Sequence, residues 1–245
     1  ITQWMSLGFI HGVMNTDNCA ISGETIDYGP CAFIDSYHPM TVFSSIDLAG
    51  RYAYGAQPDI IVWNMAQLAT ALLTLEPDPE ATLPDYSAAV HAMPDLLATA
   101  WTGTLLRKIG ITDAAPGDLD LANQLLQIMS TQGADFTNTF AGLITDAARD
   151  QFADPAPFDD WARDWRSRLA TQPAPETTMR AANPMLIPRN HRIEEMIQAA
   201  ITGNLAPFHR LLQACNTPFN DDPDTADLRL PPTEKERITA TYCGT

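Results

Sequence analysis

Three polar side chains near the start of the chain have the types and spacing to bind a metal ion and to accept a proton. Asp17 and Asn18 end the segment HGVMNTDN, which starts at residue 11, and Asp27 opens the segment DYG nine residues later. Carboxylate and amide oxygens are hard ligands that suit Mg²⁺, and a second carboxylate beside them can act as a general base. The pattern therefore indicates a metal site with a proton acceptor next to it.

The spacing is similar to that of a protein kinase, in which a catalytic loop ends in a metal-binding Asn and a later Asp-Phe-Gly supplies the second metal ligand. Asn18 would be that Asn, and Asp27 that Asp. The kinase base would fall on Val13, two residues after His11, and valine cannot take a proton. A plain kinase interpretation therefore fails at its central residue. We expect His11 to be a structural hydrogen-bonding residue of the loop.

Five blocks of sequence resemble the SelO (YdiU) family of protein adenylyltransferases, kinase-fold proteins once called pseudokinases. They are HGVMNTDN, SGETIDYGPCAF, GRYAYGAQP, NPMLIPRNH and the terminal TYCGT. The resemblance implies Mg²⁺- or Mn²⁺-dependent transfer of AMP from ATP to Ser, Thr or Tyr hydroxyls of proteins. It further implies that Asp17 is the proton acceptor, that Asn18 and Asp27 bind the metal, and that Asp27 also lies close to the nucleotide.

Other interpretations of the same residues stay open. A protein or small-molecule kinase is one alternative, and Val13 speaks against it. A non-catalytic, nucleotide-sensing pseudokinase scaffold is another, although a dead scaffold has no physical need for all three polar residues. Asp and Asn also favour turns, so a purely structural role is the plainest alternative. A calcium loop fails because residues 17–27 lack the D-x-[DN]-x-[DN]-G register.

The charge and composition of the chain speak against some classes of binding partner. The 245-residue chain has a net charge of −16 and only two lysines, Lys108 and Lys235. A protein this acidic is a poor electrostatic match for nucleic acid or for an anionic membrane. No apolar run approaches the length that spans a bilayer, and no signal or transit peptide is visible. We therefore expect a cytoplasmic protein without nucleic-acid or membrane partners, and the family resemblance implies that its partners are ATP and protein substrates.

The first residues, ITQWM, have the character of the middle of a helix, which predicts a C-terminal fragment without its N-terminal lobe. No G-x-G-x-x-G motif and no lysine precede His11. In kinase-like folds those features hold the phosphates. We therefore expect the isolated fragment to be inactive and to bind ATP weakly, with Arg51 the first candidate for a replacement phosphate contact.

The predicted fold is mainly α. Residues 1–78 are expected to form the core of a kinase-like C-terminal lobe with the catalytic and metal loops, and residues 79–245 a helical extension with a C-terminal Cys tail. A short β-hairpin is expected within residues 21–34, with Asp27 on a turn. Asp118 and Asp135 are expected to be helix N-caps. Helices are predicted near 60–75, 86–109, 118–131, 136–151, 158–171, 187–203 and 207–214, with 171–188 as a connector.

Four cysteines, at positions 19, 31, 215 and 243, are too few for a disulfide-stapled scaffold. In the family that the sequence resembles, the region of Cys243 carries Cys or selenocysteine. Some bacterial members pair it with a Cys shortly after the DYG segment. Here Phe43 stands where that partner would be, which speaks against the same redox switch.

Other polar groups are expected to be structural. The run Arg189-Asn190-His191 is predicted to start a helix and to satisfy backbone groups there. Asp35 and Asp47 are expected to be solvated or loop-capping acids, and the acidic run over 221–227 to be a solvated face.

Overall fold

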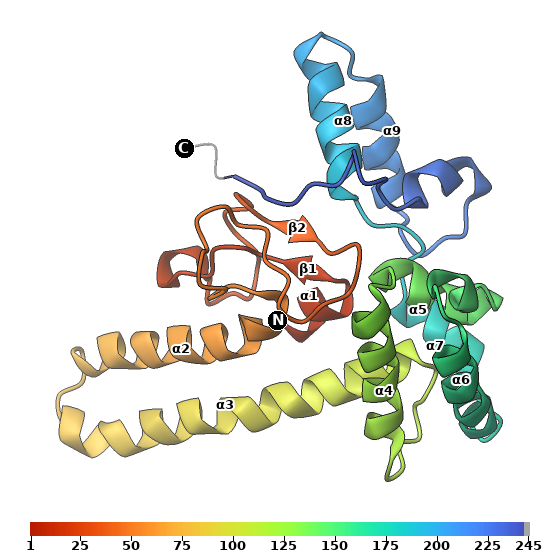
Figure 1. Cartoon of the computed structure of the whole chain (residues 1–245). Helices are drawn as coiled ribbons and strands as arrows, with labels where there is room; N and C mark the ends of the chain where they lie inside the picture. Colours follow the sequence, from red (N-terminus) through yellow and green to blue (C-terminus); the bar gives the residue numbers. More distant parts are fainter. Residues whose placement is uncertain (243–245) are drawn as a thin grey trace.

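The computed structural model describes residues 1–242 and is mainly helical, as predicted (Figure 1). Its one sheet in this part of the chain is an antiparallel pair, β1 (Phe9–Ile10) with β2 (Ala32–Phe33). The strand prediction needs a correction. A hairpin was expected within 21–34, but β2 pairs with residues that precede the catalytic loop. The pairing therefore closes both predicted loops at a common base.

The sheet lies among short elements at the start of the chain. These are α1 (Thr2–Ser6), the 3-10 turn η1 (Thr16–Asn18) and the 3-10 turn η2 (Tyr54–Ala56). η2 leads directly into α2 (Gln57–Leu73), which has Pro58 in its first turn, a position where a missing N–H costs nothing.

A long helical hairpin, α2 with α3 (Pro79–Lys108), projects from the rest of the molecule (Figure 1). Asp78 caps α3, because its side chain accepts a hydrogen bond from the Ala81 N–H at 3.2 Å. α3 starts earlier than the predicted residue 86 and contains Pro84 and Pro94. Proline usually interrupts a helix, which is why the sequence pattern placed the start after Pro84.

Four helices and a 3-10 turn follow the hairpin. They are α4 (Asp118–Gln132), α5 (Phe136–Thr145), η3 (Ala148–Gln151), α6 (Ala156–Leu169) and α7 (Pro175–Ala182). The predicted helix over 136–151 breaks at Asp146, which adopts the left-handed conformation. α7 was missed, since its segment was expected to be a connector.

The two predicted N-caps differ. Asp135 caps α5 by accepting from the Asn138 N–H at 2.8 Å. Asp118 is not a cap: the N-cap of α4 is Gly117, and the Asp118 carboxylate instead pairs with Arg168 at 2.8 Å. The sequence could not reveal that ion pair, because it joins two different helices.

The main hydrophobic core runs from the strands into this helical region. Aromatic contacts join the two parts: the Phe136 ring packs against Tyr37 and Tyr54 with ring centroids 5.6 and 6.1 Å apart. The core therefore crosses the predicted domain boundary at residue 78. The division into residues 1–78 and 79–245 stays a prediction.

A smaller unit completes the described chain: α8 (Asn190–Ile201), α9 (Ala206–Cys215) and η4 (Pro223–Arg229). Its own core consists of Leu186, Leu211, Ala214 and Leu228. The acidic run is exposed, as predicted, and two of its acids form surface ion pairs, Asp221 with Arg229 and Asp227 with Arg210. No helix in the described residues is both long and apolar enough to span a membrane.

A buried ion cluster, here the Arg189 cluster (Asp35, Asp135, Asn138 and Arg189), joins this unit to the strands. Arg189 is 1% exposed and donates to Asp35 at 2.6 Å, to Asp135 at 2.8 Å and to Asn138 at 3.1 Å. The structural interpretation of Arg189 is thus confirmed. The expectation of a solvated or capping Asp35 is wrong, because its carboxylate is partly buried and pairs with this guanidinium. Burial outweighs the nearby positive charge and raises the pKa of Asp35.

Asn190 adds to the connection between this unit and the strands. Its side-chain amide pairs with the backbone of β2 as a neighbouring strand would. Its side-chain amide donates to the Phe33 carbonyl at 2.8 Å and accepts from the Phe33 N–H at 3.3 Å. The start of α8 is therefore fixed directly to β2.

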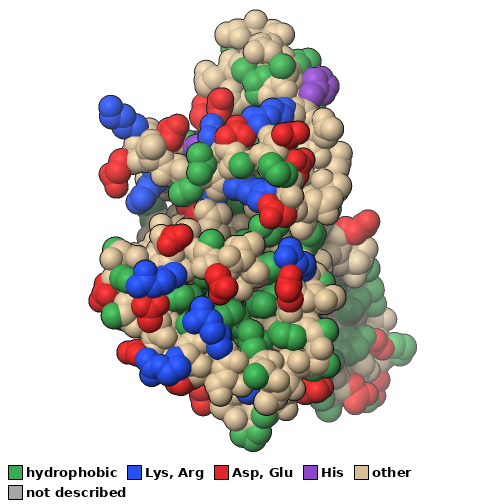
Figure 2. All heavy atoms as spheres, turned by 90° about the vertical axis from the view of Figure 1, so that its right-hand side faces the viewer, with side chains coloured by type: hydrophobic (Ala, Val, Ile, Leu, Met, Phe, Trp, Pro, Cys, Tyr) green, Lys and Arg blue, Asp and Glu red, His purple; other side chains and the backbone are tan. Residues whose placement is uncertain are grey.

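The outer face of the helical region carries mixed charges. Figure 2 shows acidic and basic side chains interspersed there. Arg149 pairs with Asp159 and Arg163 with Asp160 in this region. Basic side chains on this face are thus largely neutralised by neighbouring carboxylates.

Candidate active site

Residues 11–31 form one excursion between the paired strands, here called the 11–31 loop. Its base is closed by the pairs Phe9 with Phe33 and Ile10 with Ala32, and an isolated bridge joins Cys19 to Thr25 near its tip. Asp17 lies two residues before this bridge and Asp27 two residues after it. The two carboxylates therefore occupy equivalent positions on the outgoing and returning legs of one loop.

The returning leg is held immediately before Asp27. His11 is fully buried, and its Nε2 lies 2.9 Å from the Ile26 carbonyl oxygen, so the ring donates at that nitrogen. The indole N–H of Trp4 donates to the Thr25 hydroxyl at 3.1 Å, and the Trp4 ring stacks on His11. The prediction that His11 is a structural hydrogen-bonding residue is confirmed.

Backbone conformation is unusual at two residues of the 11–31 loop, Gly12 on the outgoing leg and Asp27 on the returning leg. Gly12 has a φ of +85°, and a Cβ atom there would lie 2.7 Å from the Pro30 carbonyl oxygen. Only glycine therefore lets the two legs approach so closely at the base. Asp27 itself has a φ of +52°, a conformation that Asp adopts more readily than most residues but that still costs free energy.

The outgoing leg is held from α2 and from the segment before it. The buried Asn64 side chain donates to the Met14 carbonyl at 3.0 Å, and the Tyr52 hydroxyl donates to the Asn15 side chain at 2.5 Å. Asp47 accepts from the backbone N–H groups of Arg51 and Tyr52 at 2.9 and 2.7 Å, so its predicted capping role is confirmed.

The predicted site residues keep their functional oxygens uncommitted. Asn18 uses its amide nitrogen to donate to the Val13 carbonyl at 3.0 Å, which leaves Oδ1 as the atom available to a metal. Asp17 and Asp27 are exposed, and neither carboxylate has a hydrogen-bond or ion-pair partner within residues 1–242. An exposed, unpaired carboxylate is chemically ready to bind a cation or to take a proton.

A metal at this place would rely on few protein ligands. Among the described residues there is no group of three or more His, Cys, Asp and Glu side chains that could hold a metal ion. One carboxylate, Asp27, and one amide, Asn18, nevertheless fit Mg²⁺, which keeps several waters and is usually shared with substrate phosphates. The residues present thus suit a metal that arrives with a nucleotide.

Sequence reasoning missed the residues that support the loop from outside, namely Gln57, Asn64 and Tyr52. Gln57 is fully buried, accepts from the His11 N–H at 3.1 Å and donates to the Phe9 carbonyl at 3.0 Å. The available signal was weak: Tyr52 and Gln57 lie in the block GRYAYGAQP, and Asn64 is a polar residue among the apolar residues of α2.

The end of the described chain also supports the loop. Thr241 pairs with the segment after β2: its N–H donates to the Phe43 carbonyl at 2.7 Å and its carbonyl accepts from Ser45 at 3.0 Å. Its hydroxyl donates to the Pro30 carbonyl at 2.5 Å. Phe43, the residue expected to replace a cysteine, is thus a backbone partner of this segment. Cys243 lies outside the described residues.

The three described cysteines are not joined to one another by disulfides. Burial raises the pKa of the Cys19 and Cys31 thiols, which therefore stay protonated at neutral pH. Neither has the lowered pKa of a reactive thiol.

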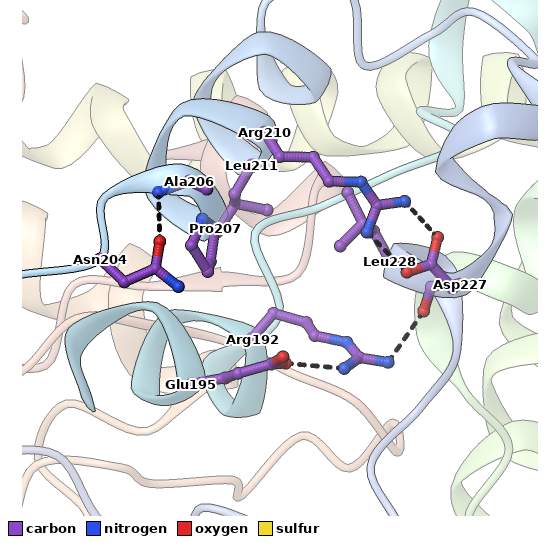
Figure 3. A pocket seen from close by; sticks show the side chains of 9 residues that line it. All are labelled: Arg192, Glu195, Asn204, Ala206, Pro207, Arg210, Leu211, Asp227 and Leu228. Atoms are coloured by element: carbon purple, nitrogen blue, oxygen red, sulfur yellow. Dashed lines mark hydrogen bonds and ion pairs between the residues drawn. The ribbon is translucent and has the colours of Figure 1, made fainter. Parts of the chain in front are cut away.

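A pocket of about 280 Å³ lies elsewhere, between α8, α9 and η4 (Figure 3). Its basic groups are already occupied: Arg210 forms two short contacts with the Asp227 carboxylate, at 2.7 and 2.6 Å, and Arg192 pairs with Glu195 at 2.8 Å. None of the three predicted site residues lines it, and we assign it no function.

Comparison with known proteins gives consistent matches. A family model described as "Protein adenylyltransferase SelO" matches residues 1–216. A "Protein nucleotidyltransferase YdiU" of Roseobacter denitrificans is 61% identical over 245 residues, which are 100% of this chain and 52% of that protein. Proteins of the same name from Ruegeria sp. and Bradyrhizobium diazoefficiens are 58% and 46% identical, with the same coverage. The chain thus spans about half the length of these relatives.

Proposed function

The chain belongs to the SelO family of protein adenylyltransferases, and from that premise we propose that the full-length protein transfers AMP from ATP to Ser, Thr or Tyr hydroxyls of proteins. Asp17, Asn18 and Asp27 carry this proposal, because their oxygens are uncommitted on one rigidly supported loop. The proposal concerns the longer protein, since this chain spans about half of its relatives.

Each residue has one task in the proposed reaction. Asp27 and Asn18 Oδ1 would hold Mg²⁺ or Mn²⁺, which would neutralise charge on the phosphates. Asp17 accepts the proton of the acceptor hydroxyl. The hydroxyl oxygen then forms a bond to the α-phosphorus, the bond from that phosphorus to the β-phosphate oxygen breaks, and pyrophosphate leaves.

Support for AMP transfer over phosphate transfer comes from the position of the base. Val13 stands where a kinase carries its catalytic Asp, while Asp17 lies directly beside the ligand Asn18. A base moved along the loop is consistent with attack at a different phosphorus atom. The kinase and the non-catalytic scaffold are therefore the less favoured alternatives.

The test uses the full-length protein with ATP labelled on either the α- or the γ-phosphate. We expect label on protein acceptors only from α-labelled ATP, and only with divalent metal present. Transfer of the γ-label would identify a kinase. Metal-dependent nucleotide binding without any transfer would identify a scaffold. An Asp120→Ala variant, which changes an exposed acid far from the loop in sequence, is the control for unspecific loss of charge.

A further inference from the structure

Arg51 is an exposed cation whose environment differs from that of most arginines in the chain. Most of the other arginines in this acidic protein pair with carboxylates, as Arg168 does with Asp118. Within the described residues Arg51 has no such partner. Its guanidinium carbon lies 4.6 Å from the centroid of the Trp63 ring and 5.7 Å from that of Tyr52. These three residues form what we call the Arg51 platform.

The platform is attached to the leg of the loop that carries Asp17. Tyr52 donates to Asn15, two residues before Asp17, and Trp63 directly precedes Asn64, which holds Met14. The Asp27 leg is held by other residues, Trp4 and His11. The platform thus lies beside the leg that carries the proposed proton acceptor Asp17, next to the proposed metal ligand Asn18, and a substrate hydroxyl has to approach Asp17 to give up its proton.

Exposed apolar side chains flank the same cation. Ile46 and Leu48 lie on either side of Asp47, the residue that fixes the Arg51 backbone, and are 71% and 96% exposed. Trp63 is 43% exposed. A cation among exposed apolar side chains matches a polypeptide segment that combines an acidic with an aliphatic residue.

Resting on the proposed function, we propose that the Arg51 platform recognises an Asp or Glu side chain close to the acceptor hydroxyl of the protein substrate. Guanidinium binds carboxylate in a bidentate manner, and stacking on Trp63 holds the group in place before the substrate arrives. Because the chain carries a net charge of −16, an acidic substrate would be repelled without such a local cation.

The experiment measures AMP transfer by the full-length protein to two peptides that differ only in Glu or Gln two residues from the hydroxyl. We expect Arg51→Gln to lower kcat/KM for the Glu peptide about tenfold, the loss expected for one surface charge-assisted contact. The Gln peptide should change less than about twofold. Arg51→Lys should retain part of the preference, and Arg51→Glu should reverse it.

Arg107→Gln is the matched control, since Arg107 also lacks a carboxylate partner in residues 1–242 but lies on α3, bound to Thr104. Equal losses for both peptides, or a raised KM for ATP, would overturn the proposal in favour of a structural or nucleotide contact. If the unmodified full-length protein transfers nothing, the proposed function is wrong. The role of Arg51 is then tested separately, by fluorescence anisotropy of the two labelled peptides binding to the protein. Tighter binding of the Glu peptide that Arg51→Gln removes supports the platform, and equal binding of both peptides refutes it.

Discussion

The 11–31 loop and the Arg189 cluster both contain acidic and amide side chains, but within residues 1–242 only the carboxylates of the Arg189 cluster have a positively charged partner. In the Arg189 cluster, Asp135 is buried and Asp35 partly buried, and their carboxylates lie 2.8 and 2.6 Å from one guanidinium. In the loop, Asp17 and Asp27 are exposed without such a partner. A satisfied carboxylate stabilises the fold, whereas an unsatisfied one on a rigid support is available for chemistry. The predictions below test this contrast.

The largest effect is expected from the loop carboxylates in the full-length protein. Asp17→Ala should lower AMP transfer by about 10²- to 10⁴-fold, the usual contribution of a general base, and leave ATP binding largely intact. Asp27→Ala should abolish metal-supported ATP binding, because it removes a direct ligand. Calorimetry of ATP with Mg²⁺ separates the two roles. Equal loss of binding in both variants would show that Asp17 is a ligand instead of a base.

The isolated 245-residue chain should bind ATP weakly or not at all, and should not modify itself. It offers the proposed metal ligands Asn18 and Asp27 but has no lysine before His11, so most phosphate charge would stay uncompensated. Calorimetry against the full-length protein measures the difference. Micromolar affinity in the isolated chain would contradict this and would make Arg51 a phosphate contact.

In the Arg189 cluster the expected effect is on stability. Arg189→Met should lower the free energy of unfolding by about 3–5 kcal/mol, since it leaves a buried and a partly buried carboxylate without a counter-ion. Adding Asp35→Asn and Asp135→Asn should restore part of the loss. Chemical denaturation measures both changes. A loss no larger than that of the exposed Arg180→Met, whose partner is Glu176, would show that the cluster contributes little.

Gly12 and Gly23 offer a matched pair within the loop. Both have positive φ, but a Cβ at Gly12 would lie 2.7 Å from the Pro30 oxygen, whereas a Cβ at Gly23 would have nothing within 4 Å. Gly12→Ala should therefore cost about 1–3 kcal/mol and reduce transfer, and Gly23→Ala should cost less. Equal effects would mean that backbone conformation alone, and not the contact between the legs, determines the cost.

The smallest expected effect is on how the free energy of unfolding depends on pH. Lys108 is 1% exposed, its ammonium nitrogen lies 4.3 Å from the Phe140 ring centroid, and burial lowers its pKa from 10.5 to about 7. Between these two values the unfolded chain binds more protons than the folded one, so this group makes stability rise with pH from about 7 to about 10.5. Lys108→Met should remove that slope in denaturation curves. An unchanged slope would contradict the lowered pKa.

What the sequence could predict depended on distance along the chain. Helices with a regular apolar period were located well, and the local cap of Asp135 was correct. The partner of Asp35 is 154 residues away, and no local pattern in the sequence marks that contact. The same holds for the strand before the loop and for the pair of Asp118 with Arg168, which depend on how distant segments pack.

The sequence predicts a chemical type for the site, which stays a prediction, but not the residues that support it. The residue types of Asp17, Asn18 and Asp27 already indicated a metal and a base, because ligand chemistry is a property of the side chain. Their supports, such as Gln57 and Tyr52, act through hydrogen bonds across 37 to 48 residues. Such contacts become visible only when the fold is known.

The contact between Thr241 and Pro30 also has a consequence for the order of events during synthesis. These residues are 211 positions apart. At ribosomal rates of about 5–20 residues per second, Thr241 appears about 10–40 s after Pro30. The nascent 11–31 loop therefore lacks the hydrogen bond from Thr241 to Pro30 while the intervening helices are synthesised and fold. The 11–31 loop thus gains its full set of described contacts only after Thr241 has been synthesised.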